Sequence, residues 1–284
     1  MSQEYLQKMK QLALEAGEIT LRYRNNSSPS YKSDKSIVTR ADKEISALAK
    51  VLFKDFLTLP GHILIDEEDA ASVEYLDEKS LEKASHIFAI DPVDGTRIYA
   101  NGMPNFGVSI GLLKDRKPWL GVVYFPVLGE LFFCDSRQSY FVRNAFKKEE
   151  EKSPLKPIDQ EINKQTLFLL PDAFFNRFDW DFTDCHILIP ACAVVDLCWP
   201  AIGRGCGCVL KSYIWDFAGS WPIALSAGLK LRNWRTGKVL ERVEADLFSK
   251  AETPWKLKDY YILSSERNFP ILRDKIKLKN NKKS

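Results

Sequence analysis

Apolar residues recur with helical spacing in two segments near the start of the chain. In residues 2–24 they return every three or four positions, at Leu6, Met9, Leu12, Ala13, Ala16, Ile19 and Tyr23. The second segment begins near residue 39, stops before Pro60-Gly61 and carries Ile45, Leu48, Leu52 and Phe56. This spacing predicts two amphipathic helices, each with one face buried against a core.

Short apolar runs predict strands after the second helix. Residues 63–65 and 87–90 are such runs, and residues 106–113, 119–124, 131–134 and 140–142 continue the series with short turns between them. Consecutive strands joined by short turns are typical of an antiparallel meander. The run at 87–90 is expected to end at Pro92, because proline has no N–H to donate to a neighbouring strand.

The segment Lys147–Pro157 is charged, poor in apolar residues and contains two prolines, so it is the best candidate for a lobe boundary. Beyond it, strands at 167–170, 186–189 and 207–210 alternate with helices near 172–178 and at 191–202. This alternation predicts an α/β lobe. We therefore expect an N-terminal α+β lobe over 1–150, a C-terminal α/β lobe over 151–270 and a flexible basic tail over 271–284.

Composition excludes several classes of function. The 284 residues are 45% hydrophobic and carry a net charge of +3, which gives no electrostatic case for nucleic-acid binding. No apolar run reaches the roughly 18 residues that span a bilayer, and the N-terminus lacks the pattern of a signal peptide. We expect a cytoplasmic protein that binds neither nucleic acid nor membrane. Five of the six cysteines lie within residues 185–208 without a paired C-x-x-C, which favours buried free thiols over a zinc site.

Two carboxylates follow the apolar run at 87–90 directly, in Asp91-Pro92-Val93-Asp94-Gly95-Thr96. They lie at a strand end around a tight turn, and hard cations such as Mg²⁺ bind carboxylate oxygens. The N–H groups of Gly95 and Thr96 are expected to point toward the same place, where they suit an anion. A lone D-x-x-D is better explained as an acidic surface turn. Five fixed positions, however, match by chance only on the order of once in ten thousand.

Three further acidic blocks lie in order around this motif. Thr39 and Asp42 open the second helix, Glu67-Glu68 follow the strand at 63–65, and Trp215-Asp216-Phe217-Ala218-Gly219 lies well downstream. Taken alone, Asp42 fits a charge favoured in a first helical turn. The two glutamates fit a solvated acidic loop, and Asp216 fits a helix N-cap.

Taken together, the four blocks resemble the inositol monophosphatase family, the lithium-sensitive, Mg²⁺-dependent phosphatases of sugars and nucleotides. The resemblance runs from the second helix to the last third of the chain. It implies an α/β protein with a layered α-β-α-β-α fold that hydrolyses a phosphomonoester with metal-activated water. A homodimer is possible by the same resemblance.

The family pattern also implies roles for individual residues. One Mg²⁺ would bind Glu67, Asp91 and the Val93 carbonyl, and a second would bind Asp91, Asp94 and Asp216. A third, weaker ion near Glu67 is an option. Asp42, Glu67 and Thr96 would be catalytic, with Thr96 and Asp42 orienting and deprotonating the water. Gly95 and Thr96 would hold the phosphate through their N–H groups.

The substrate side departs from the family pattern. Cys206 and either Leu210 or Lys211 stand where the family carries the carboxylates that bind sugar hydroxyls, and Asp66 replaces a glycine. Lys211 is expected to bind substrate, and its charge suits a second phosphate or an acid group. We expect an inositol or sugar phosphate, or a nucleotide such as adenosine 3′,5′-bisphosphate, with inositol 1-phosphate not the best substrate. The alternative is a catalytically weak member that binds metal and ligand in a structural or regulatory role.

Overall fold

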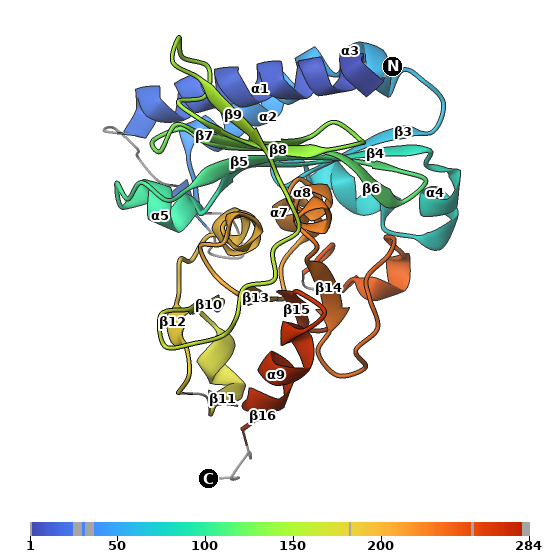
Figure 1. The fold of residues 1–284 in the computed structure, drawn as a ribbon. Helices are drawn as coiled ribbons and strands as arrows, with labels where there is room; N and C mark the ends of the chain where they lie inside the picture. The colour runs from blue at the N-terminus through green and yellow to red at the C-terminus, as the bar shows by residue number, and fades with distance from the viewer. Residues whose placement is uncertain (1, 25–29, 32–36, 182, 251–252, 280–284) are drawn as a thin grey trace.

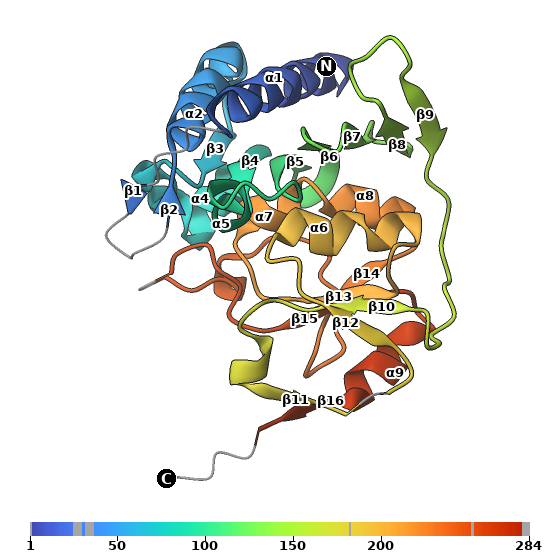
Figure 2. The same ribbon diagram turned by 90° about the vertical axis from the view of Figure 1, so that its left-hand side faces the viewer.

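The computed structural model describes residues 2–24, 30–31, 37–181, 183–250 and 253–279. Helices and sheets alternate in layers through the molecule (Figures 1 and 2). The outermost layer holds α1 (Ser2–Tyr23), α2 (Arg40–Leu52) and the short α3 (Lys54–Leu57). The apolar face of α1 is buried at Met9, Leu12, Ala13, Ala16 and Ile19, as its helical spacing predicts, while Leu6 and Tyr23 are only partly buried. The layered α-β-α-β-α arrangement expected from the sequence is confirmed.

The first sheet lies directly beneath α1 and α2 and has seven strands in the order β3-β4-β5-β6-β7-β8-β9. Their bounds are β3 (His62–Asp66), β4 (His86–Asp94), β5 (Gly107–Lys114), β6 (Lys117–Phe125), β7 (Glu130–Cys134), β8 (Ser139–Arg143) and β9 (Glu151–Pro154). β3 pairs with β4 in parallel, and β4 to β9 form the expected antiparallel meander. Helices cover both faces of the central strands, so β4 is apolar and buried almost throughout.

The second sheet has five strands in the order β12-β10-β13-β15-β14. Its strands are β10 (Leu167–Leu169), β12 (His186–Leu188), β13 (Gly207–Leu210), β14 (Lys230–Asn233) and β15 (Tyr261–Ser264). Between the two sheets lie α6 (Ala193–Cys198), α7 (Ile214–Ala218) and α8 (Trp221–Ser226), and α9 (Asn268–Lys275) lies beyond the second sheet (Figure 2). Smaller elements are α4 (Glu78–Lys83), α5 (Thr96–Ala100), β1 (Ser30–Tyr31) and β2 (Ile37–Val38).

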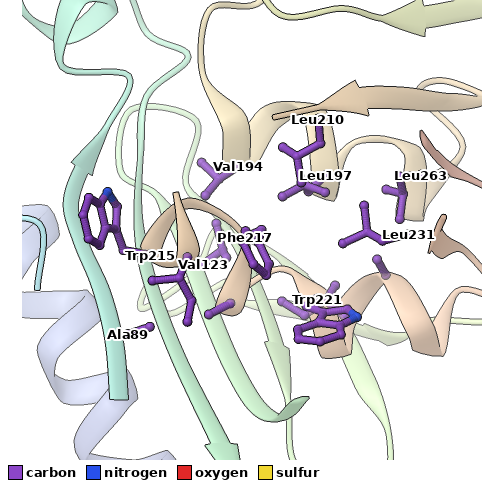
Figure 3. Packing of buried hydrophobic residues seen from close by; sticks show 14 of the residues in the cluster. Ala89, Val123, Val194, Leu197, Leu210, Trp215, Phe217, Trp221, Leu231 and Leu263 are labelled. Carbon is purple, nitrogen blue, oxygen red and sulfur yellow. The ribbon is translucent and has the colours of Figure 1, made fainter. Parts of the chain in front are cut away.

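One hydrophobic cluster joins the two sheets through the helices between them (Figure 3). Trp215, Phe217 and Trp221 from α7 and α8 belong to it. Ala89 and Val123 reach it from the first sheet, and Leu231 and Leu263 reach it from the second. The helices that carry part of the acidic motif are therefore fixed from both sides. Among the described residues, no helix is long and apolar enough to cross a membrane.

Two expectations about strand ends need correction. β4 continues through Pro92 to Asp94. Its pairing with β5 shifts register between Asp91 and Asp94. Pro92 lies within this irregular stretch, where no N–H from the proline is needed for pairing. The expected boundary at Lys147–Pro157 contains β9, an edge strand of the first sheet. Pro154 is tolerated there because an edge strand leaves one side unpaired.

The helices expected in the second half are shorter than predicted. The segment near 172–178 holds one 3₁₀ turn, Phe174–Asn176, and the segment 191–202 splits into α6 and a 3₁₀ turn that starts at Pro200. Of the expected tail, residues 271–275 belong to α9, and β16 (Ile276–Leu278) pairs with β11 (Phe178–Trp180). Buried Leu272 and Ile276 anchor this end of the chain. Residues 280–284 lie outside the described part.

Candidate active site

The end of β4 places Asp91 and Asp94 side by side on the irregular stretch of the first sheet. The Asp91 carboxylate accepts a 3.0 Å hydrogen bond from the Val93 N–H, and Thr96 Oγ1 donates to the Val93 carbonyl at 2.9 Å. Gly95 turns the chain into α5 with φ of 83°, a left-handed conformation that favours glycine. A Cβ atom at Gly95 would lie 3.2 Å from Cys192 Sγ, so the turn is also closely packed.

Helix α7 brings Asp216 to this strand end, and small residues make the approach possible. Gly111 of β5 and Gly121 of β6 face each other in the sheet. A Cβ atom at Gly121 would lie 2.0 Å from the carbonyl oxygen of Gly219, just after α7. Ser109 Oγ fixes the same contact by donating to the Trp215 carbonyl at 2.8 Å. The small residues of the Trp215–Gly219 motif therefore serve packing, and that packing positions the Asp216 carboxylate.

Asp42 lies in the first turn of α2, in a capping box with Thr39. Its Oδ2 accepts hydrogen bonds from the Thr39 N–H at 2.7 Å and from Thr39 Oγ1 at 2.5 Å. Its Oδ1 is buried and has no hydrogen-bond partner in the described part of the chain. In this structure Asp42 is thus bonded to Thr39 rather than to Thr96, and one carboxylate oxygen remains for another group.

Asp66 is buried at the end of β3 and faces α2. Ser46 Oγ donates to Asp66 Oδ2 at 2.6 Å, and the Glu68 N–H donates to Oδ1 at 2.9 Å. The next residue, Glu67, is tied to the strand by a 3.2 Å bond from its N–H to the Ile90 carbonyl. The aspartate in place of glycine therefore forms internal bonds, while Glu67 continues toward the cluster.

Burial and mutual repulsion raise the pKa values of the clustered carboxyl groups. Burial raises the pKa of Asp42 to about 7, with the charges of Glu67 and Glu68 adding to the effect. Burial also raises the pKa of Asp94 to about 7, against the lowering effect of two backbone N–H donors. The pKa values of Asp91 and Asp216 are raised well above 3.8 by burial and then by neighbouring carboxylates. A bound cation would relieve this repulsion.

The donor set fits a hard divalent cation, although no three side chains of the described residues already have the spacing of a metal site. Asp94 is held by the N–H groups of Ala193 at 3.0 Å and Val194 at 2.5 Å. Asp216 Oδ2 accepts from the Tyr213 N–H at 2.9 Å. The charges of Glu67, Asp94 and Asp216 all act on Asp91, which therefore lies among them. Four carboxyl groups and the Val93 carbonyl provide only oxygen ligands, which suits Mg²⁺ or Ca²⁺.

A cavity of about 520 Å³ opens over the acidic cluster between the two sheets. The expected site residues that line it are Glu67, Asp94, Gly95, Thr96, Lys211 and Asp216. Asp42, Asp91 and Val93 are buried and are not among the lining residues. The fold therefore gathers residues from opposite ends of the sequence around one cavity.

A model of the inositol monophosphatase family matches residues 1–268. The chain belongs to the inositol monophosphatase family. This confirms the resemblance read from the four acidic blocks, and it classes the chain with the phosphoric monoester hydrolases.

Curated relatives of this inositol monophosphatase family member differ in their named activities. Inositol monophosphatase 1 of Solanum lycopersicum is 27% identical over 229 residues, which are 78% of this chain and 79% of that protein. The 3′(2′),5′-bisphosphate nucleotidase CysQ of Salmonella typhimurium is 26% identical over 254 residues, covering 86% of this chain and 96% of that protein. The relatives thus leave the substrate open.

A solved structure of an IMPase/NADP phosphatase, complexed with NADP and Ca²⁺, has a TM-score of 0.73 with this chain. The two are 16% identical, and the match covers 96% of this chain and 95% of the other. At this level of identity, the likeness shows a shared fold. It agrees with the layered arrangement described above.

In this inositol monophosphatase family member, basic residues line the same cavity as the acidic cluster. Lys211 and Lys256 line the cavity, and they also line a second hollow of about 480 Å³ that shares Pro171 and Asp172 with the first. Burial lowers the pKa of Lys211, and the charges of Arg177 and Lys256 lower it further. Within the described ranges, no ion pair includes either lysine.

Each of these two lysines lies over an aromatic ring. Lys211 Nζ is 5.1 Å from the centre of the Tyr260 ring, and Lys256 Nζ is 5.1 Å from that of Tyr213. The Tyr213 ring is itself stacked on Trp215, with centres 4.8 Å apart. Aromatic faces hold ammonium groups in place without neutralising their charge. The two ammonium groups are thus held at the cavity wall, and no ion pair of the described residues includes them.

The structure adds site residues that the sequence analysis missed. Asp196 of α6 and Lys256 line the cavity, and the N–H groups of Ala193 and Val194 bind Asp94. A signal for Asp196 was present, because it is the single charged residue in the apolar segment 192–199. Lys256 carries no such signal, since its position depends on how the segment after β14 folds back.

Proposed function

We propose that this protein is a Mg²⁺-dependent phosphomonoesterase acting on a small phosphate ester that carries a second anionic group. One observation supports this most directly: a single cavity is lined both by carboxylates from the sheet and α7 and by Lys211 and Lys256. The carboxylates suit cations and the phosphate that they bind, while the lysines suit a further anion.

The proposed metal ligands are Glu67, Asp91, Asp94 and Asp216 with the Val93 carbonyl, holding two or three ions. When bound, Mg²⁺ neutralises charge on the phosphate oxygens and makes water more acidic. Backbone N–H groups hold two carboxylates of this set in place, those of Ala193 and Val194 at Asp94 and that of Tyr213 at Asp216. The N–H groups of Gly95 and Thr96, which line the cavity, are proposed to bind the phosphate.

Asp42 is proposed as the group that takes the proton from the attacking water. Its Oδ2 is fixed by Thr39, its Oδ1 has no partner among the described residues, and its pKa is raised to about 7. A carboxyl group with such a pKa exchanges protons efficiently near neutral pH. Thr96 is proposed to orient the same water, since its hydroxyl is already positioned by the bond to the Val93 carbonyl.

Phosphate release from a substrate panel tests this proposal. The panel contains inositol 1-phosphate, fructose 1,6-bisphosphate, adenosine 3′,5′-bisphosphate and an aryl phosphate, each measured with Mg²⁺ and with chelator. We expect Mg²⁺-dependent release that is fastest from a bisphosphate. Asp91→Asn should lower kcat by about 100-fold or more, because metal ions contribute several kcal/mol to stabilising such transition states.

Asp55→Asn is the matched control, since Asp55 is exposed on α3 and remote from the cluster. It should retain wild-type rates. Faster release from inositol 1-phosphate than from the bisphosphates would contradict the substrate class. If no substrate released phosphate while Mg²⁺ still raised the melting temperature, the protein would instead be the catalytically weak, ligand-binding member of the family.

A further inference from the structure

Asp196 is a buried carboxyl group for which the proposed catalytic arrangement has no use. Its side chain is 4% exposed, between fully buried Val195 and Leu197 on α6. Oδ1 is completely buried and has no hydrogen-bond partner in the described part of the chain. None of the ion pairs of the described residues includes this carboxylate. A desolvated carboxyl group without a donor is costly, so the fold retains it against a free-energy penalty.

The open space beside Asp196 is the cavity over the acidic cluster. Asp196 is one of the residues that line it, together with Asp94, Val209 and Leu210. Its place on α6 is fixed by the helical bond from the Asp196 N–H to the Cys192 carbonyl. The same helix begins with the N–H groups of Ala193 and Val194 that bind Asp94. Asp196 thus lies within one helical turn of the residues that contact the acidic cluster.

The surroundings select the chemistry of the missing group. The charges that act on Asp196 are those of Asp94 and Asp172, and both are negative. A phosphate or carboxylate of the ligand would therefore be repelled from this position. Among the described residues, Asp196 belongs to no group of three side chains with the spacing of a metal site, so it suits a neutral O–H donor better than a metal ion that needs several oxygens.

We propose that Asp196 is a specificity-determining residue that accepts a hydrogen bond from a substrate hydroxyl on a carbon close to the phosphate ester. It takes the place of the sugar-binding carboxylates that residues 206–211 lack, but it comes from α6 rather than from β13. This inference rests on the proposed phosphatase function. The inference adds one requirement to that function: the substrate is a hydroxylated phosphate ester.

Two matched substrate pairs test the inference. Adenosine 3′,5′-bisphosphate is compared with its 2′-deoxy analogue, and glycerol 2-phosphate is compared with propan-2-yl phosphate. For Asp196→Val, kcat/KM should fall at least about tenfold on the hydroxylated member of each pair and less than about threefold on the other, since only the hydroxyl loses its acceptor. Asp196→Asn keeps the shape of the side chain and one acceptor oxygen, so its kcat/KM on the hydroxylated substrates should fall less than that of Asp196→Val.

Asp179→Val, at an exposed position of β11, is the control and should leave kcat/KM for all four substrates unchanged. Circular dichroism checks that each variant folds. Equal losses on both members of a pair would assign Asp196 a structural role and overturn the inference. A weaker effect of Mg²⁺ on the melting temperature of Asp196→Asn would assign it to a cation and overturn it as well.

Equilibrium binding separates this inference from the proposed function. If the wild type releases no phosphate from any ester, the phosphatase proposal fails. Calorimetric binding of both adenosine compounds still tests Asp196. Tighter binding of the hydroxylated compound by the wild type, lost in Asp196→Val, supports the inference, and equal binding by both proteins overturns it.

Discussion

At the scale of single residues, the site combines acidic groups that repel one another with lysines that no carboxylate of the described residues neutralises. Asp94 accepts two backbone N–H bonds from α6, whereas Lys211 and Lys256 rest on aromatic rings. Hydrogen bonds stabilise the ionised carboxylate without adding a counter-charge, and the aromatic rings leave the ammonium groups available. We therefore expect the cavity to discriminate among phosphate esters by whether they carry a second anion.

Removing the two lysines should affect only substrates with a second anion. In the double variant Lys211→Ala with Lys256→Ala, we expect KM for the preferred bisphosphate to rise about tenfold or more, because a charge-assisted hydrogen bond contributes roughly 1.5–3 kcal/mol. KM for an aryl phosphate should change less than about twofold. Steady-state kinetics on both substrates provide the measurement.

Lys54→Ala, on the exposed side of α3, is the matched control and should alter neither KM. The same rise in KM on both substrates would show that the two lysines bind the reacting phosphate instead. That result would place the second anion elsewhere or remove it from the proposal.

At the scale of elements, the close contact between α7 and the first sheet decides where Asp216 lies. Gly111 and Gly121 present no side chains at the place where Ala218 and Gly219 approach. The acidic motif on α7 and the two glycines on neighbouring strands, about 100 residues earlier, thus form one structural unit. The position of Asp216 depends on the distance between the backbones of α7 and the sheet, which a methyl group at either glycine would increase.

Gly121→Ala should lower the free energy of unfolding by about 3 kcal/mol, the upper part of the usual range for overpacking a core. It should also weaken the effect of Mg²⁺ on the melting temperature, because α7 and Asp216 would be displaced from β4. Chemical denaturation and thermal melts with and without Mg²⁺ measure the two effects.

Gly102→Ala provides the comparison, since Gly102 has φ of 72° and a Cβ atom there would have no neighbour within 4 Å. Its cost is confined to backbone strain of about 1–2 kcal/mol, and its response to Mg²⁺ should match that of the wild type. A Gly121→Ala protein as stable as the wild type would show that the contact between α7 and the sheet is easily deformed.

At the scale of the whole molecule, the sequence predicted the layers and the acidic residues better than it predicted the substrate side. Helical spacing located α1 and α2, and short apolar runs located β3 to β8, because both patterns are local. The four acidic blocks gave the carboxylates of the cluster. By contrast, β9 and β16 are short edge strands, and Lys256 and Asp196 reach the cavity only through long-range packing, which no local pattern records.

Gathering carboxylates from both halves of the chain should make the stability of the metal-free protein depend on pH. The pKa values of Asp42 and Asp94 are raised from 3.8 to about 7, and those of Asp91 and Asp216 are also raised. Between about pH 4 and pH 7 the folded protein holds protons that the unfolded chain has lost. Its free energy of unfolding must therefore fall as the pH rises through this window.

In chelator, we expect the melting temperature to fall by about 5 °C or more between pH 5.5 and pH 8, a change of a few kcal/mol for a protein of this size. Mg²⁺ binds the ionised carboxylates of the folded state, so its stabilising effect should grow over the same range. Asp216→Asn should weaken the pH dependence of the melting temperature in chelator and the pH dependence of the stabilisation by Mg²⁺. A melting temperature in chelator that is constant or rises with pH would contradict this account.

The placement of α6, α7 and α8 between the two sheets also has a consequence for how the chain is synthesised. The last strand of the first sheet ends at Pro154, whereas the helices that cover its second face span Ala193–Ser226. At about 5–20 residues per second, a ribosome takes several seconds to make the missing cover. During that time the nascent chain exposes a broad apolar sheet surface with uncompensated carboxylates at its end. This interval is when the protein most needs a chaperone.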